Sequence, residues 1–386
     1  MFQERTREMK KQYLVTPGPS PVPQEVRLAL AEEIIHHRTK QFQGYIKQAT
    51  EDLKKIFKTE NDLFILASSG TGAMEASVAN VIGTGDKAIT IEGGKFGERW
   101  TELVKAFGGT AIVHKVAWGE GPKPEDIAQL LKANPGVKAV YATLCETSTA
   151  TVQDIAGLGK AVAPTGALLV VDGISAVGAL DCRTDAWGID MLVVGSQKAL
   201  MMPPGLAFIT VSKKAWDAIG KTKRTVYYFD LMLAKKAAAD SDTPYTSAVS
   251  MIRALCEATK LILADGMDAV VLRHATLAKA TRAGVAALGL ELFSKAPSDA
   301  VTAVVLPKGM DGKALTKVLS GKYGVTVAGG QGPLTGKIIR IAHMGYMDKF
   351  DIVTVIAALE MALAEMGQKV QLGAGVAAAE KVLLNG

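Results

Sequence analysis

The chain has 386 residues, of which 48% are hydrophobic and 21% charged, proportions typical of water-soluble globular proteins. Apolar runs reach only about seven or eight residues, which is too short for a membrane-spanning helix. The net charge of +6 is scattered along the chain and aromatic residues make up only 6% of it, which argues against nucleic-acid binding.

The N-terminus and the cysteines indicate the cellular compartment. The first twelve residues, MFQERTREMKKQ, carry both signs of charge and lack a hydrophobic segment, so we expect no signal peptide. Cys145, Cys182 and Cys256 are widely spaced and form no CxxC pair, which disfavours a disulfide framework or a structural zinc site. We therefore expect a cytoplasmic protein without a metal centre.

Short apolar runs alternate with helical stretches between residues 60 and 215. The predicted strands are 62–67, 87–91, 137–142, 167–172 and 190–195, and the predicted helices are 73–82, 98–107 and 124–133. The strands are continuous β-branched-rich runs, as expected for strands buried on both faces. This alternation predicts an α/β domain in which a mainly parallel sheet lies between helices.

The pattern changes toward the C-terminus. Two long helices, 248–265 and 268–288, precede strands at 300–307, 325–329 and 337–343, and two further helices, expected on the surface, end the chain. This order predicts a smaller α+β domain. We expect an N-terminal segment (1–20), a large domain (21–264) and a small C-terminal domain (265–386).

The loop after the first predicted strand is rich in small residues. Ser68-Ser69-Gly70-Thr71-Gly72 precedes a helix, and amides at a helix start can hold a phosphate. Glu75 stands where a dinucleotide-binding fingerprint needs its third glycine, which disfavours such a site. A nucleotide-binding P-loop is equally disfavoured, because Ala215 replaces the first glycine of a motif ending in Gly220-Lys221-Thr222.

Further chemical groups follow the later strands, where open parallel sheets bind ligands. Phe96, between glycines, could stack on a planar ligand, and the loop containing Thr147 offers hydroxyl donors. Asp172 ends an apolar strand, where a carboxylate needs a cationic partner. Lys198 follows the next strand, where burial can free its amine to form an imine. Each residue alone could be structural, but together they supply what pyridoxal phosphate requires.

Two segments, VVDGISAVGAL (170–180) and GIDMLVVGSQKALMMPPGLAF (188–208), resemble the class V aminotransferases of fold type I. The resemblance is to the alanine–glyoxylate and serine–pyruvate aminotransferases, and it runs from TPGPS (16–20) to Arg340. It implies a large domain that binds pyridoxal 5'-phosphate and a smaller C-terminal domain.

The resemblance also implies roles for single residues. Lys198 would be the Schiff-base lysine and general acid/base, Asp172 would pair with the pyridine nitrogen, and Arg340 would bind the substrate α-carboxylate. Gly18 would bring the backbone close to the substrate. The remaining cofactor contacts would be the ring-stacking Phe96, Ile174 on the opposite face, Thr147 at the ring hydroxyl, and Ser69, Gly70, Thr71 and Gln197 at the phosphate.

One implied phosphate contact comes from a neighbouring subunit. Thr243 resembles that residue, which implies a homodimer with shared active sites. Asp240 stands where some relatives have a tyrosine near the phosphate, and its charge would repel the phosphate, so we assign it no role. His37-Arg38 resembles a pair in bacterial relatives without indicating a function.

The predicted reaction transfers an amino group from alanine or serine to glyoxylate or pyruvate. A second hypothesis is another class V enzyme, a cysteine desulfurase or a lyase. Desulfurases generally have a stacking histidine and a reactive cysteine, whereas Phe96 takes the stacking position here. A third hypothesis is a non-catalytic binding protein, which would have no chemical need for Lys198, Asp172 and Arg340 together.

Overall fold

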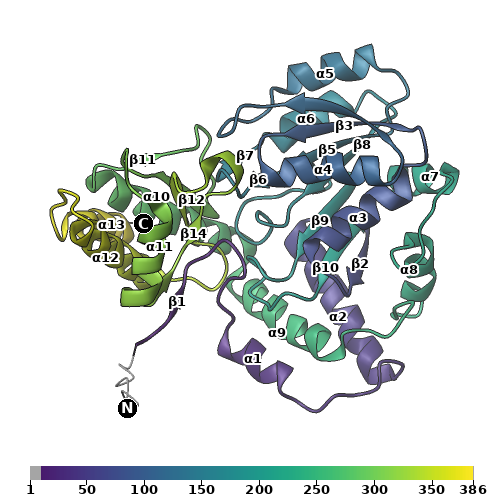
Figure 1. Cartoon of the computed structure of the whole chain (residues 1–386). Coiled ribbons are helices and arrows are strands. Elements are labelled where there is room, and N and C mark those ends of the chain that lie inside the picture. The colour runs from purple at the N-terminus through teal and green to yellow at the C-terminus, as the bar shows by residue number, and fades with distance from the viewer. Residues whose placement is uncertain (1–9, 386) are drawn as a thin grey trace, which may run out of the picture.

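A seven-stranded sheet lies at the centre of the computed structural model, which describes residues 10–385. Its strands are β2 (Asp62–Leu66), β3 (Lys87–Glu92), β4 (Thr110–Lys115), β5 (Ala139–Thr143), β8 (Leu168–Asp172), β9 (Met191–Gly195) and β10 (Ala207–Val211). They are ordered β2-β10-β9-β8-β5-β3-β4 across the sheet (Figure 1). The five strands from β9 to β4 run parallel, and β10 is antiparallel to both of its neighbours.

Alternate residues of the central strands enter different hydrophobic cores, one on each face of the sheet. Leu169 and Val171 of β8 enter the first core, whereas Leu168 and Val170 enter the second. Helices that contribute to the first core are α1 (Gln24–Leu30), α2 (Lys40–Phe57), α5 (Pro124–Ala133), α6 (Ile155–Val162) and α9 (Val249–Asp265). The second core receives α3 (Gly70–Val81), α4 (Lys95–Ala106), α7 (Lys213–Lys221) and α8 (Leu231–Ala238). Burial on both faces explains why the strands are continuous apolar runs.

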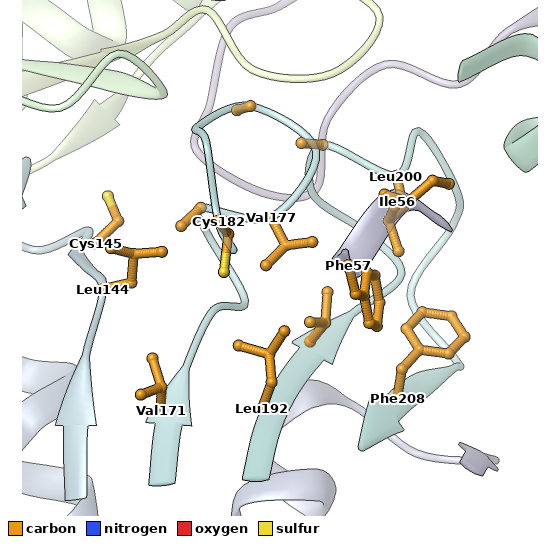
Figure 2. Close-up of a cluster of buried hydrophobic side chains, with 14 of the residues drawn as sticks. Ile56, Phe57, Leu144, Cys145, Val171, Val177, Cys182, Leu192, Leu200 and Phe208 are labelled. Atoms are coloured by element: carbon orange, nitrogen blue, oxygen red, sulfur yellow. The ribbon is translucent and has the colours of Figure 1, made fainter. Parts of the chain in front are cut away.

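The first core extends beneath the loops that follow the strands. Figure 2 shows Val171 and Leu192 below the loop residues Val177 and Leu200. The ring of Phe57, from α2, meets the ring of Phe208 edge-on, with centroids 6.2 Å apart. Burial of a side chain of this size stabilises the fold by roughly 1.5–3 kcal/mol. The same packing therefore supports both the sheet and the loops at its edge.

A second, antiparallel sheet is built from the C-terminal part of the chain. Its order is β11 (Glu291–Leu292), β12 (Val301–Val305), β15 (Ile338–Ala342) and β14 (Ala328–Gly329). Side chains of this sheet share a third hydrophobic core with α10 (Met267–Ala287), α11 (Gly312–Val318), α12 (Lys349–Glu365) and α13 (Ala374–Asn385). Short elements complete this part: η1 (Leu319–Tyr323) and η2 (Gly332–Leu334). Figure 1 shows these helices gathered on one side of the molecule.

The N-terminal segment pairs with the C-terminal part of the chain, which contains the second sheet and is called the C-terminal unit below. The short strand β1 (Tyr13–Leu14) pairs in parallel with β13 (Val325–Thr326). The chain then runs from Val15, whose carbonyl accepts a hydrogen bond from Ala342 N at 3.0 Å, into the turn at residues 16–20. The segment thus connects the C-terminal unit to the edge of the central sheet.

The α/β class and the mainly parallel sheet are confirmed, and most predicted elements are present. Helix α5 has the predicted bounds, and Gly266, with φ +80°, separates α9 from α10 where the sequence predicted a break. The expected strand 325–329 is instead divided between β13 and β14, which belong to different sheets.

Two strands of the central sheet were not predicted, and the expected position of one helix was wrong. β4 is a half-buried edge strand without a long apolar run, and β10 follows directly on the Pro203-Pro204-Gly205 turn. The expectation of a surface helix is wrong for α12, because Ile356, Leu359 and Leu363 pack in the third core.

No helix within residues 10–385 is long and apolar enough to cross a membrane. The expected division of the chain at residues 20 and 264 stays a prediction. Its second boundary falls at the end of α9, one residue before the break between the two long helices.

Candidate functional site

Six of the seven strands end at the same edge of the central sheet, and only β10 runs the other way. β3, β5, β8 and β9, whose loops concern the site, are parallel, and β2 has the same direction because both β2 and β9 are antiparallel to β10. In such sheets the loops at the carboxyl ends form the ligand site. Those loops, the first turns of the helices after them and the last residue of β8 carry the predicted Ser69, Gly70, Thr71, Phe96, Thr147, Asp172, Ile174, Gln197 and Lys198.

Lys198 lies in the turn after β9 and is held against the N-terminal segment. Its Nζ donates a hydrogen bond to the carbonyl oxygen of Pro17. Ser20 Oγ donates to the carbonyl of Lys198 at 2.6 Å, which fixes the backbone of the turn. Burial lowers the pKa of Lys198 to about 8, although the charge of Asp172 acts in the opposite direction. An amine with this pKa is available as a nucleophile close to neutral pH.

Gly18 is the point of closest approach to Lys198. Its φ of +112° is a conformation that residues with side chains rarely adopt. A Cβ atom at this position would lie 2.5 Å from Cδ and Cε of Lys198. Only glycine therefore allows the backbone to lie alongside the lysine, and the expected approach of Gly18 to the substrate stays a prediction.

Asp172 is the last residue of β8, and only 4% of its surface is exposed. Its Oδ1 accepts a hydrogen bond from the backbone of Ile174 at 2.8 Å. Burial raises the pKa of Asp172 to about 7, and this hydrogen bond opposes the rise. A buried carboxyl of this kind is matched to a cationic partner, such as a protonated ring nitrogen.

Ile174 and Gln197, two other predicted residues, lie beside the start of α3. A Cβ atom on Gly195 would lie 3.0 Å from Gln197 Oε1, 3.2 Å from Ile174 Cγ2 and 3.6 Å from the Cα of Gly70. The Ser69 side chain makes no capping hydrogen bond to α3. Gln197 Oε1 is buried without a hydrogen-bond partner among residues 10–385. Backbone N–H groups at a helix start can bind an anionic ligand, and the NH₂ group of a glutamine side chain can donate to the same ligand.

Phe96 lies in the first turn of α4 and contacts an arginine that the sequence analysis missed. The Cζ of Arg99 lies 5.2 Å from the centroid of the Phe96 ring. Arg99 Nη1 donates to Thr71 Oγ1 at 3.1 Å. Residues three apart share one helix face, so the predicted helix 98–107, extended by one turn, would have placed Arg99 beside Phe96.

Arg340 reaches the same region from β15 of the second sheet. Its Nε donates to the carbonyl of Gly329 and its Nη1 to the carbonyl of Thr147, both at 3.0 Å. Burial lowers the pKa of Arg340 to about 10, so it stays protonated at neutral pH. The two bonds fix the plane of the guanidinium and leave Nη2 without an acceptor within residues 10–385. A carboxylate could bind there through parallel hydrogen bonds.

Thr147 connects this arginine to the Asp172 turn. Its Oγ1 donates to Ser175 Oγ at 2.6 Å, while its carbonyl accepts from Arg340. The predicted hydroxyl donor therefore lies between the residue expected to bind the ring and the residue expected to bind the substrate.

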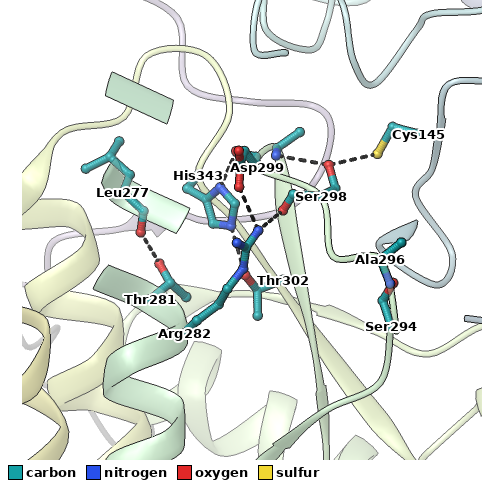
Figure 3. A network of polar contacts seen from close by, with 11 residues as sticks. Cys145, Leu277, Thr281, Arg282, Ser294, Ala296, Ser298, Asp299, Thr302 and His343 are labelled. Carbon is teal, nitrogen blue, oxygen red and sulfur yellow. Dashed lines mark hydrogen bonds and ion pairs between the residues drawn. The ribbon is translucent and has the colours of Figure 1, made fainter. Parts of the chain in front are cut away.

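A polar network fastens the two units together beside this site (Figure 3). Cys145 Sγ donates to Ser298 Oγ at 3.2 Å. Arg282 Nη2 donates to the Ser298 carbonyl and to Asp299 Oδ1, the latter at 2.8 Å. The Nδ1 atom of His343 lies 2.7 Å from the carbonyl oxygen of Asp299. The loop that carries Thr147 is therefore anchored to the second sheet.

The structure does not place Thr243 in this cluster. It lies in the loop between α8 and α9, where Arg38 Nη1 donates to its carbonyl at 2.8 Å. Arg38 also pairs with Asp242 at 2.6 Å, and Thr243 Oγ1 donates to the carbonyl of Tyr245 at 2.8 Å. Thr243 lines a cavity of about 250 Å³ that also touches Ala67, two residues before Ser69.

The residues at the sheet edge fit pyridoxal phosphate. They offer a buried carboxyl with a raised pKa, a lysine with a lowered pKa and a helix start that its N-cap side chain does not cap. The aldehyde, ring nitrogen and phosphate of the cofactor each have a chemically suitable partner in this set.

Comparisons with known proteins show the family of the chain. Residues 12–352 match the family described as aminotransferase class-V. The soluble hydrogenase 42 kDa subunit of Anabaena cylindrica is 40% identical, with 97% of this chain and 99% of that protein covered. The serine–glyoxylate aminotransferase of Methylorubrum extorquens is 37% identical, with 98% of this chain and 97% of that protein covered.

A solved structure has the same architecture over its whole length. The ureidoglycine–glyoxylate aminotransferase from Bacillus subtilis superposes with a TM-score of 0.93 at 30% identity. The match covers 98% of this chain and 100% of that one.

Proposed function

The chain belongs to the class V aminotransferases, and we propose that it moves an amino group from alanine or serine to glyoxylate or pyruvate. It is a transaminase, and its cofactor is pyridoxal 5'-phosphate. The observation that carries the proposal is the meeting of three groups at one edge of the sheet. Asp172 ends β8, Lys198 follows the adjacent strand β9, and Arg340 donates to the carbonyl of Thr147 in the loop between β5 and β8.

The residues proposed to hold the cofactor surround this edge. Asp172 would pair with the ring nitrogen, and Phe96 and Ile174 would lie on its two faces. Thr147 would bind the ring hydroxyl. At the phosphate we propose Ser69, Gly70, Thr71 and Gln197, supported by the start of α3, which the Ser69 side chain does not cap.

Lys198 would hold the cofactor and then move a proton. When bound, pyridoxal phosphate supplies an aldehyde that bonds to amines and a conjugated ring that draws electrons from the substrate Cα. With a pKa of about 8, the Lys198 amine can accept the proton from Cα and return it at C4′. The Pro17 carbonyl, which accepts a hydrogen bond from Nζ, limits the positions this amine can take.

Asp172 would act on the ring of the cofactor, and Arg340 would act on the carboxylate of the substrate. A carboxylate at Asp172 would keep the ring nitrogen of the bound cofactor protonated, because separating the two charges would leave both unpaired in a buried site. Arg340 would bind the α-carboxylate, with its plane already set by the carbonyls of Gly329 and Thr147. Such preorganisation lowers the entropic cost of placing Cα beside Lys198.

The choice of substrates rests on the relatives. One of them is named for serine and glyoxylate, and the solved structure is named for ureidoglycine and glyoxylate. Both names contain glyoxylate, which supports a small 2-oxo acid as acceptor. Alanine or serine as donor, and pyruvate as a second acceptor, come from the motif resemblance.

We also propose a homodimer in which Thr243 serves the neighbouring subunit's phosphate site. The ion pair with Arg38 holds the loop of Thr243, and large apolar side chains near this loop are exposed. Tyr227 is 76% and Tyr228 51% exposed. An aromatic surface of this kind beside a predicted binding residue supports burial by a second copy.

A cytoplasmic location remains part of the proposal. All three cysteines are free and buried, which is compatible with a reducing compartment. Their burial also weighs against a desulfurase, which needs a cysteine that can reach its substrate. Burial raises the pKa of Cys145 to about 12, so its thiol is a poor nucleophile.

The test is the visible absorption spectrum of the purified protein with and without L-alanine or L-serine, using Lys198→Ala as the control. We expect a cofactor band that is lost on adding the donor, returns with glyoxylate and is absent in the control. A band that ignores both donors would favour a desulfurase or lyase. No band after incubation with pyridoxal phosphate would favour a non-catalytic binding protein.

A further inference from the structure

Glu146 is a buried carboxylate that the proposed mechanism does not use. Only 1% of its surface is exposed. It lies in the short strand β6 (Cys145–Glu146), which pairs with β7 (Thr151–Val152) next to the site. A carboxylate is costly to bury unless strong donors surround it, so its partners indicate what it stabilises.

Those partners belong to the first turn of α4. Glu146 Oε2 accepts from Phe96 N at 3.1 Å and from Gly97 N at 2.9 Å. Its Oε1 accepts from Ser148 N at 3.2 Å and from the Ser148 hydroxyl. Ser148 Oγ in turn accepts from Lys95 N at 3.1 Å. The carboxylate and its serine therefore bind three successive amides of the turn that carries the Phe96 ring.

Gly94 makes this close approach possible. A Cβ atom on residue 94 would lie 2.6 Å from Cγ of Glu146. Gly94, two residues before Phe96, is therefore required by packing and not by a ligand. Its lack of a side chain lets the carboxylate reach the amide groups of the turn.

The residues on both sides of Glu146 are held by hydrogen bonds. Its neighbour Thr147 binds Arg340 through its carbonyl, and its other neighbour, Cys145, donates to Ser298 of the C-terminal unit. Because both flanking residues are anchored, the position of the carboxylate is fixed, and so is the turn that it binds. A rigid supporting shell is what holds a functional side chain within a fraction of an ångström.

We propose that Glu146 is a positioning residue: by binding the amides of Phe96 and Gly97, it holds the Phe96 ring in place against the cofactor. The inference rests on the proposed stacking role of Phe96. Helix dipoles favour a negative charge at this end of α4, and charge-assisted hydrogen bonds are about twice as strong as neutral ones. The pair of Glu146 and Ser148 thus sets the angle at which the ring enters the site.

The test measures cofactor binding in Glu146→Gln. The amide keeps the shape but directs an NH₂ group at backbone N–H donors, so the turn loses acceptors. We expect at least about a tenfold higher Kd for pyridoxal phosphate, together with a changed circular dichroism of the bound cofactor. The control is Glu98→Gln on the same helix, which pairs with Lys95 on the surface and should leave the Kd within about twofold.

A double-mutant cycle with Phe96→Ala separates positioning from general stability. If Glu146 acts through the ring, adding Glu146→Gln to Phe96→Ala changes the Kd less than about twofold. Equal and additive losses in both backgrounds would overturn the proposal, as would a wild-type Kd and circular dichroism in Glu146→Gln. Should that variant fail to fold, Ser148→Ala enters the same cycle with the same expectations. A wild-type protein that binds no pyridoxal phosphate would instead refute the proposed function.

Discussion

Gly18 and Lys198 are in such close contact that a methyl group on residue 18 would overlap the lysine side chain, with Cδ and Cε only 2.5 Å away. The backbone of the TPGPS turn is thus one wall of the space in which the lysine amine moves. Substitutions at Gly18 and Lys198 should therefore affect each other.

Gly18→Ala should lower kcat/KM by about 100-fold, because displacing a reacting group by about an ångström costs that much. The matched control is Gly85→Ala. Gly85 also has a positive φ, of +83°, but a Cβ there meets nothing within 4 Å. Both variants carry the same kind of backbone strain, so similar losses of melting temperature are expected. Equal activity in the two would show that crowding of Lys198 is unimportant.

The rate at which the cofactor-free enzyme captures pyridoxal phosphate should rise with pH around a midpoint of about 8. Burial lowers the pKa of Lys198 to that value from 10.5, and only the neutral amine reacts. Stopped-flow absorbance across pH 6–10.5 measures the profile, and Lys198→Ala should lack this phase. A midpoint above 10 would mean that the amine is solvated rather than buried.

Asp172→Asn should reduce kcat by about 100- to 1000-fold, since an amide cannot keep the ring nitrogen protonated. Asp190→Asn is the contrasting variant. Asp190 is also buried, but it binds Leu169 N at 2.9 Å and Ser212 Oγ at 2.8 Å, near the start of β9 and away from the site. Its substitution should lower the free energy of unfolding while kcat stays near wild type. A large kcat loss in both variants would mean that the assay measures loss of folded protein rather than loss of the Asp172 carboxylate from the site.

The same carboxyl should make the cofactor-free protein less stable as pH rises. In the folded state the pKa of Asp172 is raised from 3.8 to about 7. The protonated form is therefore favoured by folding, and its contribution of up to about 4 kcal/mol is lost between about pH 4 and pH 7. Urea unfolding across this range measures it.

The comparison with Asp172→Asn isolates this effect, because the amide does not titrate. His274 and His343 act in the opposite direction: burial lowers their pKa values to about 4 and about 3, so they destabilise the fold on acidification. They are present in both proteins and cancel in the difference. The variant should gain stability relative to wild type as pH rises to 7. A difference that is independent of pH would contradict the raised pKa.

Arg340→Lys should raise KM for alanine about 50-fold with a smaller change in kcat, because an ammonium keeps the charge but loses the bidentate geometry. Turnover of a simple alkylamine, which has no carboxylate, serves as the internal control and should change little. Steady-state kinetics with both amines separates the two effects. An equal change for both substrates would place Arg340 outside the carboxylate site.

The strand-end residues could be predicted because parallel strands bring distant residues to one edge. Asp172 and Lys198 follow continuous apolar runs, and such runs are readable when both faces are buried. Strand β4 was missed for the converse reason: it is half-buried at the sheet edge and ends in the exposed Lys115. Its pattern contains no long apolar run.

The supporting groups were less visible in the sequence. Glu146 was read only as part of a hydroxyl-rich loop, although its carboxylate holds the turn of Phe96. The carbonyl of Pro17, which contacts Lys198, has no side-chain signature at all. Roles carried by backbone atoms, or by a charge whose partners are amides on another element, emerge only from the folded arrangement.

The pairing of β1 with β13 has a consequence for how the protein is made. Tyr13 leaves the ribosome early, but its strand partner Val325 is synthesised only near the end of the chain. The turn with Gly18 therefore reaches its final place beside Lys198 after most of the protein has already emerged. A nascent chain whose central sheet has already formed would still lack the Gly18 turn beside Lys198. We expect ribosome-bound chains halted before residue 325 to capture pyridoxal phosphate poorly compared with the released protein.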